Sequence, residues 1–179
     1  MTPLVIEIIF LLGKLLAGIA AVLLLPTLVM KFFYRSVSFG LLFSATILWL
    51  FLPVVSLFNN YLSVQSLIPF LSWGVSGVET FATFSWALTA GAVCAFAYAA
   101  GEIVGSTGKD TRNLVIGFCF LGYLLNFLAQ VALPIVLFGD YGKTIAEDDL
   151  PFLLVTLVFT IAVSCYVRFS EAAQLRYTE

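Results

Sequence analysis

The sequence predicts an all-α integral membrane protein, built as a bundle of five transmembrane helices. The chain is 62% hydrophobic and 10% charged, and its mean hydropathy is +1.11. A helix needs about 20 apolar residues to cross the ~30 Å hydrocarbon core, and the alternating segments of a membrane β-barrel are missing. We expect a single domain over residues 1–179, with spans at about 3–30, 37–58, 78–103, 113–138 and 150–169.

The first apolar stretch, residues 3–30, is expected to be a transmembrane helix and not a secretory signal. A signal has a basic start followed by a short apolar core. Here Glu7 comes first, and Lys31 and Arg35 follow the apolar run. This order is typical of a first span whose N-terminus faces outward.

The basic residues predict the orientation of all five spans. Short cytoplasmic loops are enriched in Lys and Arg. The segment from Asp140 to Asp149, on the other side, carries four acids and is expected to be an acidic outer turn. The pattern predicts an outer N-terminus and a cytoplasmic C-terminus, with the bacterial cytoplasmic membrane as the default location. Six of the eight basic residues then share the inner side: Lys31, Arg35, Lys109, Arg112, Arg168 and Arg176.

Residue usage argues against an enzyme. The chain has no His, which removes the usual general base, haem ligand and proton shuttle. Its three Cys residues form no CxxC pair, so neither a zinc site nor a disulfide is expected. The GSTGKD segment at residues 105–110 lacks half of a phosphate-binding loop. We therefore predict no cofactor, no metal, no nucleotide and no nucleic acid.

Ionisable residues inside the first span are the first candidates for function. Such a group costs roughly 2.5–3.5 kcal/mol on insertion scales. Glu7 and Lys14 lie two helical turns apart on one face. Matching depths across antiparallel spans predicts that Lys14 approaches Asn126 or Gln130.

The fourth and fifth spans add polar stripes to this candidate cluster. Tyr123, Asn126 and Gln130 lie on one face of the fourth span, and Thr160 lies near mid-depth in the fifth. We expect these faces to point into the bundle. One interpretation is structural, with interhelical hydrogen bonds of about 0.6 kcal/mol each. The other is a solute path, a binding site or a contact with a partner subunit.

The third span carries helix-end acids and a packing face. Glu79 suits a helix N-terminus, and Glu102 near the other end is expected to pair with Lys109 or Arg112, or else to line an inner vestibule. Small residues every four positions let another helix approach closely, within this chain or from another. That face consists of Ala87, Gly91, Ala95 and Ala99.

The segment between the second and third spans, residues 61–78, is too apolar for a plain linker. Pro69, Trp73 and Gly74 lie within it. We expect either an interfacial helix with Trp73 at the headgroups or a re-entrant loop that acts as a gate.

Two classes of function remain. The leading hypothesis is a non-enzymatic membrane subunit that packs with other membrane chains, or with itself, into a larger assembly. The alternative is a small transporter or a homo-oligomeric channel with a polar path near Lys14, Asn126 and Gln130. A subunit should expose part of its polar stripe to a neighbour, whereas a transporter should enclose it within one chain.

Overall fold

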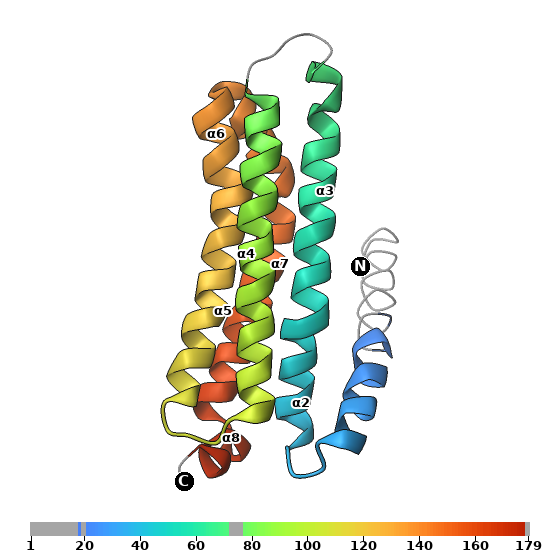
Figure 1. The fold of residues 1–179 in the computed structure, drawn as a ribbon, viewed down its shortest axis with the longest axis vertical. Coiled ribbons are helices and arrows are strands. Elements are labelled where there is room, and N and C mark those ends of the chain that lie inside the picture. The colour runs from blue at the N-terminus through green and yellow to red at the C-terminus, as the bar shows by residue number, and fades with distance from the viewer. Residues whose placement is uncertain (1–17, 19–20, 72–76, 178–179) are drawn as a thin grey trace, which may run out of the picture.

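The computed structural model describes residues 18, 21–71 and 77–177, and these form helices without any β-strand. Figure 1 shows the long helices packed side by side along the long axis of the molecule. The predicted all-helical fold is confirmed. Among the described residues, four helices are long and apolar enough to cross a membrane: Phe39–Phe70, Val78–Gly105, Thr111–Phe138 and Asp140–Phe169. A shorter apolar helix, Ala21–Phe33, precedes them, and most of the predicted first span lies outside the described residues.

Two of the long helices contain a π-helical turn. One is made of α2 (Phe39–Thr46), η1 (Ile47–Phe51) and α3 (Leu52–Leu71), and the other of α5 (Thr111–Phe127), η2 (Leu128–Ala132) and α6 (Leu133–Phe138). Pro53 and Pro134 follow these turns closely. Proline lacks an N–H and clashes with the carbonyl four residues earlier. The N–H of Leu52 and of Leu133 reaches back five residues instead, so each helix continues past its proline.

The other two long helices are α4 (Val78–Gly105) and α7 (Asp140–Phe169), and α7 is followed by the short α8 (Glu171–Arg176). A glycine with positive φ precedes each long helix: Gly77 at 96° and Gly139 at 57°. Other residues rarely adopt this backbone conformation. The turn at Gly139 sends the chain back so closely that a Cβ at Gly142 would lie 2.0 Å from the Pro134 carbonyl oxygen.

Figure 1 shows which loops and helix ends lie at each end of the bundle, and their charged residues differ between the two ends. We call one the basic end: it holds the 34–38 loop, the 106–110 loop and α8, with Arg35, Lys109 and Arg176. The opposite, acidic end holds the end of α3 and the starts of α4 and α7, with Glu79 and Asp140. The basic and acidic segments that predicted the orientation of the chain therefore lie at opposite ends of the bundle.

At the basic end, side chains donate to backbone carbonyls of the 34–38 loop and of the last turn of α4, where no following helical residue supplies an N–H. Lys31 Nζ donates to the backbone oxygens of Arg35 and Val37, at 2.7 and 2.6 Å. Arg176 Nη2 donates to the Val104 carbonyl at 2.7 Å, and the Tyr177 hydroxyl donates to the Ile103 carbonyl at 3.1 Å. The C-terminal segment is thereby fastened to the end of α4.

The prediction of an interfacial or re-entrant segment at residues 61–78 is wrong for residues 61–71, which continue α3 to Leu71. Ser63 and Leu67 are buried one turn apart, so one packed face continues through this segment. Pro69 lies exposed inside α3. Trp73 and Gly74 lie outside the described residues.

The predicted acidic outer turn at Asp140–Asp149 is also wrong, because α7 begins at Asp140. Asp140 lies in the first turn, where an acid is favourable, and it pairs with Lys143 at 2.6 Å. Ile145 and Asp149 are buried one turn apart. The helical face that packs against the bundle therefore starts well before the apolar run.

Candidate functional site

The interior of the bundle contains a zone of buried polar side chains, which we call the polar layer. Every long helix contributes to it, and all members are buried. Its members are Ser56, Asn59, Asn60 and Ser63 from α3, Ser85 and Thr89 from α4, Asn126 and Gln130 from α5 and η2, and Asp149, Thr156 and Thr160 from α7.

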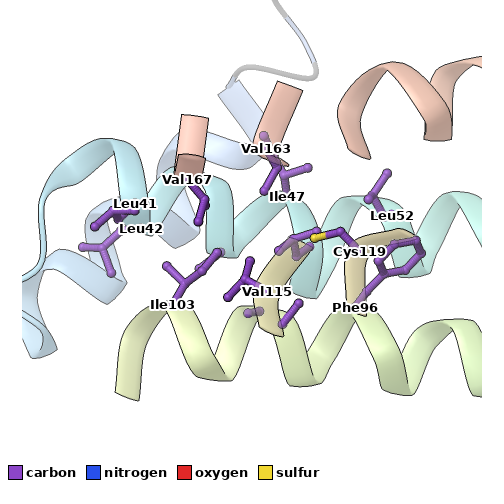
Figure 2. Packing of buried hydrophobic residues seen from close by; sticks show 14 of the residues in the cluster. Leu41, Leu42, Ile47, Leu52, Phe96, Ile103, Val115, Cys119, Val163 and Val167 are labelled. Carbon is purple, nitrogen blue, oxygen red and sulfur yellow. The ribbon is translucent and has the colours of Figure 1, made fainter. Parts of the chain in front are cut away.

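Apolar clusters lie on both sides of the polar layer. Along α3 the buried residues run from Leu52 through the polar set to Leu67, and along α4 from Phe81 through the polar set to Phe96. We call the group toward the basic end the large apolar cluster (Figure 2); it includes Leu41, Leu42, Ile47, Leu52, Phe96, Ile103, Val115, Cys119, Val163 and Val167. The small apolar cluster at the acidic end is made of Leu67, Val78, Phe81 and Ile145.

Hydrogen bonds across the polar layer join three helices. Asn126 Nδ2 donates to Ser56 Oγ at 2.7 Å, and Ser56 Oγ donates to the Leu52 carbonyl at 2.8 Å. Ser85 Oγ donates to Asn60 Oδ1. These bonds tie α3 to α5 and to α4.

Several buried polar atoms in the layer have no hydrogen-bond partner. A buried polar atom left unpaired costs about 1–3 kcal/mol. Such atoms are capable of binding water or a polar solute. They are Asn59 Oδ1 and Nδ2, Asn60 Nδ2, Thr89 Oγ1, Asn126 Oδ1 and Thr160 Oγ1.

The layer reaches a cavity of about 250 Å³ near the acidic end. Asp149 lines this cavity and is 5% exposed. The Ser63 hydroxyl lies 2.9 and 2.8 Å from its two carboxylate oxygens and donates to them. Asn59 lies beside the same carboxylate. The other lining residues are Leu62, Ser66, Tyr141, Thr144, Ile145, Asp148 and Phe152.

The structure brings three residues of the sequence-predicted cluster into the layer. Asn126, Gln130 and Thr160 are buried there, while Tyr123 on the same stripe is half-buried. Glu7 and Lys14 lie outside the described residues. The predicted approach of Lys14 to Asn126 or Gln130 therefore stays a prediction.

The two helix-end acids lie outside the polar layer. Glu79 is exposed in the first turn of α4. Glu102 accepts a hydrogen bond from Ser106 Oγ at 2.6 Å. The ion pair recorded among the described residues joins Lys143 to Asp140, so the expected pairing of Glu102 with Lys109 or Arg112 is not formed there.

The predicted small-residue face of α4 is divided between the interior and the surface. Ala95 and Ala99 are buried, Gly91 is half-buried and Ala87 is exposed. A Cβ at Gly91 would lie 3.2 Å from a methyl group of Leu125. This face therefore packs partly against α5, within the chain.

Sequence reasoning missed Asp149, Ser63 and Asn59. The assumption that the acidic segment was a turn hid Asp149, because a turn has no buried face. A signal was present: Ile145, Asp149 and Leu153 follow one another at four-residue intervals, which places the acid on an otherwise apolar stripe of a helix.

Comparisons of the chain with protein families, with curated proteins and with solved structures gave no match. Function must therefore be inferred from the polar layer. Among the described residues, no group of three or more His, Cys, Asp or Glu side chains could hold a metal ion. Hydroxyl, carboxamide and carboxylate groups in a closed interior are suited to binding a small polar or cationic solute.

Proposed function

We propose that this chain is a small membrane transport protein that takes a small polar solute or cation into the polar layer. The observation that carries the proposal is the meeting of polar side chains from all four long helices inside one chain, with several atoms unpaired. In lipid an unsatisfied polar group costs several kcal/mol. A partner-binding stripe would be exposed on the surface, whereas this one is enclosed.

In the proposed topology, residues 3–30 complete five spans, the basic end is cytoplasmic and the acidic end faces outward. The run from Leu150 to Val167 has no charged residue and is about 27 Å long at ~1.5 Å per residue. That length nearly matches the ~30 Å hydrocarbon core. Asp149 then lies at its outer margin, where a solute from the outer aqueous phase meets the cavity.

The large apolar cluster is the proposed barrier on the cytoplasmic side. Leu48, Phe96 and Val115 are fully buried in it, and a dry apolar constriction blocks polar solutes. The π turns η1 and η2 interrupt two of the helices that border the path. Irregular turns of this kind are frequent at functional sites and hinges, and we propose that the helices bend there to open the barrier.

The test is uptake into liposomes that contain the purified protein, with a panel of labelled monovalent cations and small polar solutes. Thr160→Val removes an unpaired hydroxyl from the layer and is expected to lower uptake. Thr46→Val is the matched control, since Thr46 is equally buried but bonds Leu42 and lies outside the layer. Uptake equal to that of protein-free liposomes across the panel would overturn the proposal.

The subunit hypothesis is the second candidate, and the lipid-facing side of α4 supports it. Small residues there are exposed at helical spacing: Ala87, Ala90, Cys94, Gly101 and Gly105. Such a face lets another helix approach closely. Mass measurement of the gently extracted complex tests it: a co-purifying chain, or a second copy, should be lost in Ala90→Leu. A monomer in both wild type and variant would argue against this candidate.

A further inference from the structure

The carboxylate of Asp149 is buried without a counter-charge. The Ser63 hydroxyl donates to it, but one hydroxyl supplies a single proton. Among the described residues, the nearby Lys143 pairs with Asp140 instead, and no Lys or Arg contacts Asp149. A carboxylate in such surroundings is costly unless a bound cation or a proton neutralises it.

Asn59 provides a second, independent indication of a ligand. Its side chain is 1% exposed and lines the same cavity as Asp149. Neither its carbonyl oxygen Oδ1 nor its amide nitrogen Nδ2 has a hydrogen-bond partner. An unpaired carboxamide that lines a cavity with a carboxylate can offer its oxygen to an electropositive ligand there.

The chemistry of these groups selects the class of ligand. The carboxylate of Asp149, the hydroxyl of Ser63 and the carboxamide oxygen of Asn59 are all hard oxygen donors, the kind that alkali and alkaline-earth cations prefer. Asn59 and Ser63 lie one turn apart on α3, opposite α7. Asp149 is the buried acid of this cavity, since its neighbour Asp148 is exposed. One buried carboxylate balances one positive charge. A monovalent cation therefore matches the site.

We infer that Asp149, Ser63 and Asn59 form a binding site for a monovalent inorganic cation of the sodium class. This inference rests on the proposed transport function and deepens it by naming the solute that enters the polar layer. The remainder of the 250 Å³ cavity holds water that completes the coordination of the ion.

The test is equilibrium binding of radioactive sodium to the purified full-length protein in detergent, with choline chloride keeping ionic strength constant. Wild type is expected to bind sodium saturably. Asp149→Asn should weaken binding by about tenfold or more, because it removes the charged ligand. Asp148→Asn is the matched control: it alters the adjacent, exposed acid of the same cavity and should change affinity by less than about twofold.

Asn59→Leu keeps the test valid if Asp149→Asn fails to fold. Leucine has a similar size and removes the unpaired oxygen. If the amide is merely structural, sodium affinity will not change, and the inference is overturned. If Asn59 is a ligand, the Asn59→Leu variant will bind sodium several-fold more weakly than wild type. Its elution from a sizing column should match that of wild type, which shows that it folds.

Binding in detergent is independent of flux, so the two proposals can fail separately. Absence of saturable binding, unchanged binding in Asp149→Asn, or displacement by methylammonium but not by potassium would overturn the inference, even if liposome uptake of another solute persisted. Binding that depends on Asp149 and Asn59 would establish the site, even if liposomes showed no uptake and the transport function had to be abandoned.

Discussion

The polar layer and the large apolar cluster both draw on the four long helices, yet one is polar with unpaired atoms and the other is apolar and closely packed. In the cluster, Leu48, Phe96 and Val115 are fully buried and fill the space between the helices. In the layer, hydroxyl and carboxamide groups take the same interior positions and leave atoms unpaired. Close packing stabilises helix association in lipid, whereas unpaired polar atoms oppose it. We conclude that the cluster stabilises the bundle more than the layer does, and we propose that the unpaired atoms of the layer serve binding.

The contacts of α4 show how sharply these regions meet. Phe96 belongs to the cluster and packs so tightly on Gly122 that a Cβ there would lie 2.7 Å from the ring. Two turns earlier, Thr89 is buried with an unpaired hydroxyl. Along α4, close packing at Phe96 thus gives way within two turns to an unpaired buried hydroxyl at Thr89.

The largest expected effect is the loss of packing in the cluster. Phe96→Ala removes a fully buried ring and should lower the free energy of unfolding by about 3–5 kcal/mol. Denaturation of the purified protein in mixed micelles measures this. A loss below about 1 kcal/mol would mean that the cluster is not the stabilising half of the interior.

A smaller loss of stability is expected where side chains of the polar layer are hydrogen-bonded to each other. Ser56→Ala removes the acceptor of the Asn126 amide and should cost about 1–3 kcal/mol by leaving a buried donor unsatisfied. Asn126→Leu in the same background should recover part of this loss. A double-mutant cycle measures the coupling, and strictly additive losses would show that the bond contributes nothing.

Removing an unpaired hydroxyl from the layer should not lower stability, in contrast to removing a hydrogen-bonded one. Thr89→Val deletes a buried hydroxyl without a partner and is expected to leave stability unchanged or raise it by up to about 1 kcal/mol. Thr46→Val, in contrast, removes bonds to Leu42 and from Thr27 and should lower stability by about 1 kcal/mol. Equal losses in both variants would erase the distinction between the two regions.

An effect of similar size is expected at the C-terminal edge of the cluster, and it depends on pH. Burial raises the pKa of the Tyr177 hydroxyl above its ordinary value of 10.0. The folded state therefore holds this proton more tightly than the unfolded chain does. Its contribution to stability is complete below pH 10 and is lost as pH rises above that value. Tyr177→Phe should lower stability by about 1 kcal/mol and reduce this alkaline loss, as denaturation at pH 8 and 11 can measure.

The sequence was informative where the physics is local. Apolar length predicted the membrane-length helices, and four-residue spacing pointed Asn126, Gln130 and Thr160 inward. The predictions for residues 61–71 and 140–149 were wrong, because hydropathy averages all faces of a helix. One buried face was enough to keep each of these segments helical. The meeting of Asp149 with Ser63 depends on packing between α3 and α7, which no local pattern contains.

The most direct test of the central claim is the reactivity of cysteines toward a charged, membrane-impermeant thiol reagent. Native Cys119 lies fully buried in the large apolar cluster and serves as the internal control once Cys94 and Cys165, which are exposed, are changed to Ala. In this background Ser63→Cys should react rapidly, because residue 63 lines the cavity, while Cys119 stays unmodified. If the cysteine introduced at residue 63 reacts no faster than Cys119, the polar layer is closed to solutes and the account is contradicted.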